Sequence, residues 1–378
     1  MTGIYFTDID VSADGWIRCN VTRETTEELR IQLPYSFLPA PDLIAIAFST
    51  LCGNKFDQVE IDLPIGPRLS ETLQNVLDAK LIHRAGADVR RRPGNQSALN
   101  FSGGFDSLAA KVLLPEAHLI SLDFAGRFTR ERASFEKFNP FILKTNLISL
   151  GLNKYSWAFM GIGTILMRDE LHLGSYSFGS IQAGSLPKLF SSPVNQNRFR
   201  IAAADGLNMT IANPVAGISE IGAVDLVLRY FPLAVSDVLL SVAAPGEDKF
   251  RRKSQMLQSL AATRGASLGI PTGIQSTPAV SWGEEFARDL ASLYVLKTLG
   301  ADVVASTYLG GIPDSVTKHL PSLTMDFMTR FNPQAYEGVE LSALSRWYST
   351  LTVSGILPYE RKDWFEIASV MKLLRGEM

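Results

Sequence analysis

The segment from residue 98 to residue 114 constrains the fold of this chain more than any other. Ala98-Leu99-Asn100-Phe101 is typical of a short strand, and Ser102-Gly103-Gly104 follows it as a turn. Residues 107–114 then have the composition of a helix. A strand that runs through two glycines into a helix favours an α/β fold, because parallel strands are joined by crossover helices.

The residues that follow repeat this alternation. We predict strands at residues 118–124, 141–145 and 171–178, separated by a charged helix at 130–138 and an apolar helix at 156–167. Strands that alternate with helices predict a parallel sheet covered on both faces. Beyond about residue 240 the pattern is mostly helical, and in residues 284–299 Phe286, Leu290, Leu293 and Leu296 follow one helical face.

The first 95 residues predict a strand-rich mixed domain. Residues 3–11 and 16–21 alternate on either side of the turn Ala13-Asp14-Gly15, which indicates a hairpin. Residues 42–51 and 69–82 are predicted helices, and residues 58–63 a strand. We interpret the polar residues 84–96 as a linker; its triple arginine, residues 90–92, is usually a solvated run but can also face phosphates.

The domain organisation expected from these patterns is consecutive. It comprises an N-terminal mixed α+β domain at residues 1–95, a parallel α/β domain at 96–240 and a mainly helical C-terminal region at 241–378. A chain of 378 residues agrees with two or three domains.

Composition limits the kinds of partner and the cellular compartment that we expect for this chain. The net charge is −2, so no global field attracts nucleic acid or an anionic membrane. Two cysteines, Cys19 and Cys52, and four scattered histidines argue against a zinc site and a disulfide framework. We find neither an apolar run of about 18 residues nor a signal-peptide pattern. We therefore expect a cytoplasmic protein without structural zinc that acts on small molecules; a homodimer is one option for its assembly.

The glycine turn has the chemistry of a phosphate site. Gly103 and Gly104 let the backbone turn tightly and approach a ligand. The amide groups at the start of the following helix, with the helix dipole, favour an anion. Ser102 and Ser107 add hydroxyl donors, and the carboxylate of Asp106 suits Mg²⁺ or a phosphate-bound water. The Walker pattern is absent from the sequence.

Ser102-Gly103-Gly104-Phe105-Asp106-Ser107 resembles the Ser-Gly-Gly-x-Asp-Ser motif of the PP-loop, or N-type, ATP pyrophosphatases. That superfamily includes 7-cyano-7-deazaguanine synthase, asparagine and GMP synthetases and tRNA-modifying enzymes. The resemblance implies a parallel-sheet core of the adenine nucleotide alpha hydrolase-like type. It also implies ATP on residues 102–107, with Asp106 as a catalytic residue that holds Mg²⁺. The alternative is a glycine-rich turn in an unrelated doubly wound fold.

Two later segments extend the resemblance. Asp123-Phe124-Ala125-Gly126-Arg127 is similar to the Asp-Tyr-Gly-Gln-Arg segment of deazaguanine synthases, whose strand end lies beside the nucleotide. This implies adenine near Asp123 and Phe124, and a catalytic Arg127 that meets a phosphate or a carboxylate. Residues 161–164 are similar to the region that helps to hold adenosine, which implies nucleotide contacts at Gly161 and Gly163.

The sequence also departs from the family. Residues 213–221 resemble the segment Pro-x-x-Gly-Leu-x-Lys-x-Glu-Ile, but the lysine is not in its expected place. Residues 249–253 fall where several relatives carry a Cys-x-x-Cys zinc knuckle that ends in basic residues. Here the basic residues are present and the cysteines are absent. Zinc is therefore not expected, and a close assignment to the deazaguanine synthases does not follow.

The resemblance implies AMP-forming chemistry and leaves three hypotheses. The first is a ligase that adenylates a small-molecule carboxylate or carbonyl oxygen and releases pyrophosphate, then AMP. The second is an ATP-dependent epimerase like the one acting on UDP-N-acetylmuramoyl-L-alanyl-L-glutamate, which would invert a peptidoglycan precursor through an acyl adenylate. The third is a degenerate nucleotide-binding interaction protein. Intact Ser102, Asp106 and Ser107 argue against the third hypothesis, whereas the missing cysteines and lysine keep it open.

Overall fold

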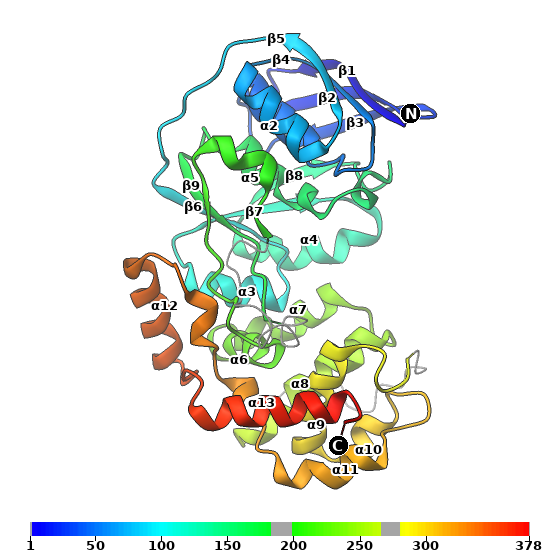
Figure 1. Cartoon of the computed structure of the whole chain (residues 1–378), viewed down its shortest axis with the longest axis vertical. Coiled ribbons are helices and arrows are strands. Elements are labelled where there is room, and N and C mark those ends of the chain that lie inside the picture. The colour runs from blue at the N-terminus through cyan, green and yellow to red at the C-terminus, as the bar shows by residue number, and fades with distance from the viewer. Residues whose placement is uncertain (1, 183–198, 266–279, 378) are drawn as a thin grey trace. The chain divides into compact units, whose positions relative to one another are not determined.

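The computed structural model describes residues 2–182, 199–265 and 280–377, and these form two compact units (Figure 1). In described residues, unit 1 comprises 2–102, 116–178 and 199–212, and unit 2 comprises 103–115, 179–182, 213–265 and 280–377. The chain passes between the units several times. The units therefore do not coincide with the consecutive division expected at residues 95 and 240.

Unit 1 is built on one sheet, whose described strands follow the order β10-β9-β6-β7-β8-β3-β2-β1-β4-β5. The strands are β1 (Gly3–Val11), β2 (Trp16–Thr22), β3 (Thr26–Gln32), β4 (Gln58–Ile65), β5 (Lys80–Ala85), β6 (Gln96–Asn100), β7 (His118–Asp123), β8 (Phe141–Thr145), β9 (Leu173–Ser177) and β10 (Thr210–Ile211).

The sheet is mixed. Strands β10, β9, β6, β7 and β8 pair in parallel, as expected from the alternation of strands and helices. Strands β1, β2 and β3 form an antiparallel meander that contains the predicted hairpin, and β4 and β5 continue from β1 in parallel. Antiparallel pairing of β3 with β8, at Ile31 and Thr145, joins the two parts. The α/β class is confirmed, and residues 1–95 share one sheet with the strands that follow them.

Alternation of apolar residues positions the core of unit 1. In β4, Val59, Ile61, Leu63 and Ile65 are buried and the residues between them are partly exposed. Helix α1 (Pro41–Ser49) packs against β4 and is buried along almost its whole length. Burying one such aliphatic side chain contributes roughly 1.5–3 kcal/mol to stability. The remaining helices of unit 1 are α2 (Pro67–Leu77), α4 (Thr129–Phe135) and α5 (Ile162–Leu166).

The described part of unit 2 is mainly helical. Helix α3 packs on α6, α6 on α8, and α8 on α9. The helices are α3 (Phe105–Leu113), α6 (Glu220–Tyr230), α7 (Val235–Val242), α8 (Asp248–Thr263), α9 (Phe286–Leu299), α10 (Ala301–Ala305), α11 (Asp314–His319), α12 (Leu341–Val353) and α13 (Arg361–Leu374). No helix among the described residues is both long and apolar enough to cross a bilayer.

Two expectations for the N-terminal region were wrong. Residues 69–82 do not form one helix: α2 ends at Leu77, Asp78 adopts a left-handed φ of 50°, and the chain turns into β5. The solvated interpretation of the triple arginine fails at Arg91. Its side chain is 5% exposed and its guanidinium group pairs with Asp42 and Asp169.

Candidate functional site

The Ser-Gly-Gly-Phe-Asp-Ser segment forms the predicted turn between a strand and a helix. Strand β6 ends at Asn100 and α3 begins at Phe105. Gly103 has a φ of 72°, a left-handed conformation that disfavours any residue with a Cβ. Ser107 donates from Oγ to the carbonyl oxygen of Gly104 at 3.0 Å, which holds the first turn of α3. The turn therefore follows from the conformation of Gly103 and from a hydrogen bond between its own residues.

A second glycine approaches the start of α3. Gly179, two residues after β9, has a φ of 63°. A Cβ on Gly179 would lie 3.0 Å from the carbonyl oxygen of Asp106 and 3.0 Å from Cα of Ser107. The backbone around Asp106 is therefore packed so closely that only glycine fits at residue 179 without strain.

A group of charged side chains in unit 2 surrounds the first turn of α3. Lys253, on α8, is 6% exposed, and its Nζ lies 2.7 Å from Oε1 of Glu220, at the first position of α6. The same Nζ lies over the ring of Phe105, 5.3 Å from its centre. A buried ammonium held by a carboxylate and an aromatic face has a fixed position. We call Asp106, Glu220 and Lys253 the charged cluster.

Asp106 is the unusual member of the charged cluster. Its side chain is partly exposed as a whole, but Oδ1 is buried and has no hydrogen-bond partner among the described residues. Burial raises the pKa of Asp106 above its ordinary value; Lys253 and Lys249 oppose this shift and Glu220 adds to it. A carboxylate oxygen without a donor is an energetic cost to the fold.

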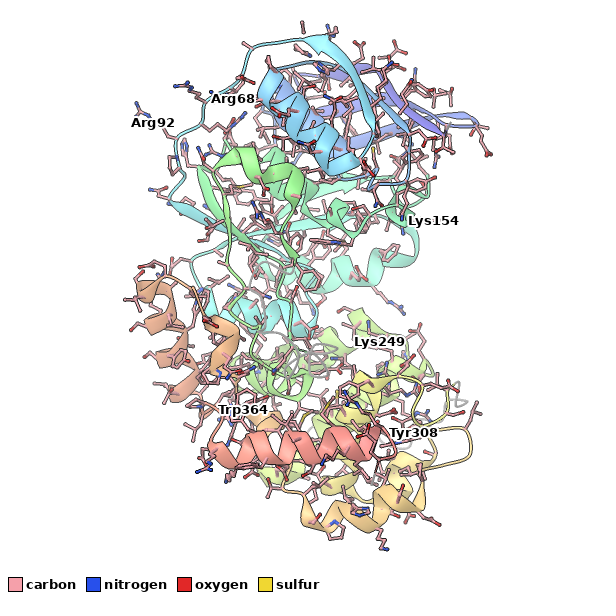
Figure 2. All side chains as sticks on the ribbon, viewed as in Figure 1. Arg68, Arg92, Lys154, Lys249, Tyr308 and Trp364 are labelled. Atoms are coloured by element: carbon pink, nitrogen blue, oxygen red, sulfur yellow. The ribbon has the colours of Figure 1, made fainter. Side chains whose placement is uncertain are left out.

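The other two members favour their charged forms. Burial works against ionisation of Glu220, yet the adjacent Lys253 holds its pKa below the usual range. Burial also opposes the charge of Lys253, but attraction to Glu220 and Asp106 raises its pKa. Lys249, one helical turn before Lys253, is exposed at the start of α8 (Figure 2). A carboxylate oxygen without a donor and two ammonium groups therefore lie near the first turn of α3.

The other predicted site residues at strand ends belong to unit 1. Ser102 is exposed and is the last residue of that unit before the turn. Asp123, at the end of β7, is 6% exposed and uses both oxygens: Oδ1 accepts from the backbone of Ala125 at 2.9 Å, and Oδ2 from Arg132 at 2.9 Å. The ring of Phe124 makes edge contacts with other aromatic rings, those of Phe128 and Phe159. These contacts shape the loop after β7.

That loop has an unusual backbone. Ala125 adopts φ 56° and ψ −165°, a region populated almost only by glycine. In the deazaguanine synthase pattern quoted above, glycine occupies this place. Arg127 lies in the 3₁₀ turn Gly126–Phe128, and its side chain is outside the described part of the structure.

Packing accounts for the two glycines expected near adenosine. A Cβ on Gly161 would lie 2.1 Å from Cδ1 of Ile201, and one on Gly163 would lie 2.6 Å from Cγ2 of Ile120. Both glycines therefore allow the start of α5 to approach its neighbours in unit 1. Their nucleotide contacts stay a prediction.

Sequence reasoning missed Glu220 and Lys253 as site residues. Both stood in segments compared with the family, but neither was assigned a role. A signal was present in α8, where Phe250, Lys253 and Leu257 follow one buried face. A lysine in such a series predicts a buried partner. The sequence does not show that α8 packs beside α6, and this packing brings Lys253 to Glu220.

Both thiols of the chain belong to the core of unit 1. Cys19 and Cys52 are free and buried, and burial raises the pKa of both thiols, that of Cys19 to about 12. Among residues 2–182, 199–265 and 280–377, no three His, Cys, Asp or Glu side chains gather as a metal site would require.

Comparison with known proteins returned no relatives. No protein-family model matches the chain, and neither the curated proteins nor the solved structures contain a match.

Proposed function

We propose that this chain binds ATP with Mg²⁺ on residues 102–107 and adenylates a small-molecule carboxylate or carbonyl oxygen. The observation that carries the proposal is the buried, unpaired Oδ1 of Asp106 beside the ammonium group of Lys253. The glycine turn and the resemblance of residues 102–107 to the PP-loop motif support it. In this account the fold is a PP-loop core.

An unpaired buried carboxylate oxygen needs a reason. It costs about 1–3 kcal/mol, and native structures contain few such groups. A hard divalent cation prefers carboxylate oxygens, and Asp106 would hold Mg²⁺. When bound, Mg²⁺ would supply neutralisation of the phosphate charges. Binding of Mg²⁺ would therefore explain why Oδ1 of Asp106 is buried without a partner, which packing alone does not favour.

The positive groups complete the proposed chemistry. Lys253 carries a fixed positive charge that stabilises negative charge building up on a phosphoryl group, and Glu220 positions Lys253. The exposed Lys249 is available for a second anion. The N-terminal end of α3, nine residues long, adds its dipole in the same sense.

In the proposed reaction, an oxygen of the acceptor forms a bond to the α-phosphorus of ATP. The bond from that phosphorus to the bridging oxygen breaks, and pyrophosphate leaves with the electron pair. A nucleophile then attacks the adenylated carbon, and AMP leaves. Covalent thiol chemistry has no support, because both cysteines are buried and their pKa values are raised.

The test is release of pyrophosphate and AMP from ATP in the presence of Mg²⁺ and a panel of carboxylic acids. Wild type should release both products with at least one acid, and Asp106→Asn should lose this activity while remaining folded. Asp302→Asn is a matched control, because Asp302 is also the second residue of a helix, α10, and is exposed. Equal product release by Asp106→Asn and wild type would contradict the proposal.

The same assay separates the two other hypotheses. An epimerase would release both products and invert a centre of the acid, which chiral chromatography detects. An interaction protein would bind ATP without releasing either product.

A further inference from the structure

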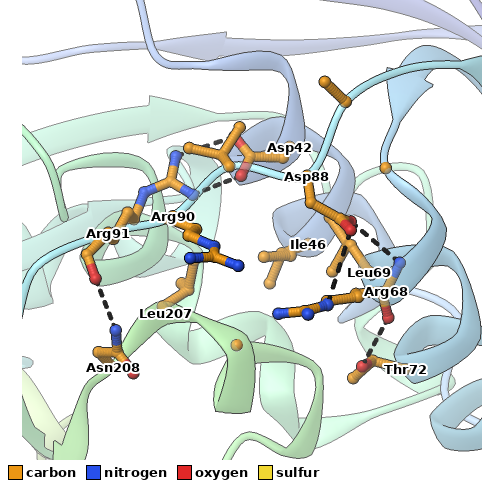
Figure 3. A pocket seen from close by; sticks show the side chains of 14 residues that line it. Asp42, Ile46, Arg68, Leu69, Thr72, Asp88, Arg90, Arg91, Leu207 and Asn208 are labelled. Carbon is orange, nitrogen blue, oxygen red and sulfur yellow. Dashed lines mark hydrogen bonds and ion pairs between the residues drawn. The ribbon is translucent and has the colours of Figure 1, made fainter.

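A pocket of about 460 Å³ lies in unit 1, where the sequence had suggested a linker (Figure 3). Its walls come from α1, α2, residues 87–91 and residues 206–208. The volume is within the range of small-molecule sites, about 300–1,000 Å³. We call residues 87–91 the strap.

The strap is fixed at one end by buried charges. Nη2 of Arg91 donates to Oδ1 of Asp42 at 2.9 Å, Nη1 pairs with the other oxygen of Asp42, and Nε donates to Oδ1 of Asp169 at 2.8 Å. The carbonyl oxygen of Arg91 accepts from Nδ2 of Asn208 at 2.6 Å. This wall therefore has a set position before any ligand arrives.

The strap is also tied to α2. Oδ1 of Asp88 accepts from the backbone amide of Arg68 at 3.0 Å, at the start of that helix. The backbones approach so closely that a Cβ on Gly66 would lie 2.6 Å from the amide nitrogen of Asp88. The strap is therefore bonded to α2 near Asp88 and to α1 through Arg91.

Two arginines of the pocket lack firm partners. Arg90 is exposed and pairs with no carboxylate in the part of the chain that the structure describes. Arg68 is 76% exposed, with Nε 3.8 Å from Oδ2 of Asp88, and an exposed pair at that distance contributes little. Figure 3 shows both guanidinium groups directed into the pocket. The pocket lining holds three arginines and two aspartates, and this excess of positive charge favours an anion there.

Part of the pocket wall is apolar. Its exposed apolar surface comes from Leu69 of α2 and Val89 of the strap, whereas Ile46 and Leu207 also line the pocket but are each 1% exposed (Figure 3). An inorganic anion would leave this surface without a partner. A ligand that suits the whole pocket carries an anionic group at one end and an apolar body at the other.

We propose that this pocket binds a small molecule in which an oxyanion, a phosphate monoester or a carboxylate, is joined to an apolar or aromatic body. The guanidinium groups of Arg90 and Arg68 hold the oxyanion through charge-assisted hydrogen bonds, and the apolar lining at Leu69 and Val89 contacts the body. The strap leads into the amino-terminal end of β6, whereas the glycine turn follows its carboxyl end. The pocket is therefore a second site, separate from the proposed ATP site.

Calorimetric titration of the full chain with three probes tests this inference. Phenyl phosphate and benzoate each join one oxyanion to an aromatic ring, and inorganic phosphate is the oxyanion alone. At least one ring-bearing probe should bind at a single site and more tightly than inorganic phosphate; the tighter of the two identifies the oxyanion. Arg90→Ala should weaken that binding about tenfold or more, because charged hydrogen bonds are lost.

Arg92→Ala is the matched control. Arg92 lies two residues along the chain, is exposed, does not line the pocket and points away from the unit in Figure 2. It should leave binding of the probe unchanged, and both variants should melt as wild type does. Failure of both ring-bearing probes to bind, or equal loss in the two variants, would overturn the inference. Displacement of the probe by ATP would also overturn it, because the probe would then occupy the nucleotide site.

Discussion

Replacing Asp106 with asparagine should stabilise the ligand-free protein. The change removes the charge and keeps the shape of the side chain. Oδ1 of Asp106 is buried without a partner, and burying an ionised carboxylate in this way costs more than burying a neutral amide of the same shape. Attraction to Lys253 offsets part of this cost. We expect Asp106→Asn to gain about 1 kcal/mol near neutral pH, or about 2 °C in melting temperature.

The gain should depend on pH in a defined direction. Burial raises the pKa of Asp106 in the native state above its ordinary value of 3.8. Below 3.8 the carboxyl group is protonated in both states, and wild type resembles the asparagine variant. As the pH rises through the native pKa, the wild-type protein loses stability that the variant keeps. The difference in melting temperature should therefore grow from about pH 4 to about pH 8.

Thermal melts of wild type, Asp106→Asn and Asp302→Asn across this range provide the assay. The control, exposed at the equivalent position of α10, should show no comparable pH-dependent gain. Addition of ATP with Mg²⁺ should reverse the order, because a ligand stabilises the form that binds it better. The reasoning is refuted if wild type is the more stable protein at neutral pH, or if the difference is the same at both ends of the range.

Two further changes test the surroundings of the site. Lys253→Met should lower the free energy of unfolding by about 3 kcal/mol, since Glu220 loses the partner 2.7 Å away, and adding Glu220→Gln should recover part of the loss. Urea denaturation measures both, and a midpoint unchanged by Lys253→Met would show that the pair is not formed. Ala125→Gly should raise stability by about 1 kcal/mol, because glycine adopts φ 56° and ψ −165° without strain. A lower melting temperature in that variant would show that the loop after β7 has another conformation.

Much of the parallel sheet follows from local sequence patterns. Strands expected at residues 118–124 and 141–145 correspond to β7 and β8, because each is a short apolar run bounded by turns and followed by a helix or a loop. Strand β5 was missed, because residues 80–85 become a strand through pairing with β4 after the left-handed turn at Asp78. That pairing is a tertiary effect which the periodicity does not contain.

The candidate site was also predictable only in part. The turn at residues 102–107 was predictable, because its glycines and its place between strand and helix are local features. The charged cluster was not, because Lys253 reaches Glu220 and Phe105 only through the packing of α8, α6 and α3. The strap was misjudged for a related reason: the partners of Arg91 are 49 and 78 residues away in sequence.

A crystal structure of the chain with Mg²⁺ and α,β-methylene ATP, which cannot release pyrophosphate, tests the central claim most directly. The account predicts that the phosphates lie on residues 103–106 at the start of α3, with Mg²⁺ held by Asp106 and Lys253 facing the phosphate charge. Electron density for the nucleotide elsewhere, including the pocket beneath the strap, or a bound nucleotide whose metal ignores Asp106, would contradict it.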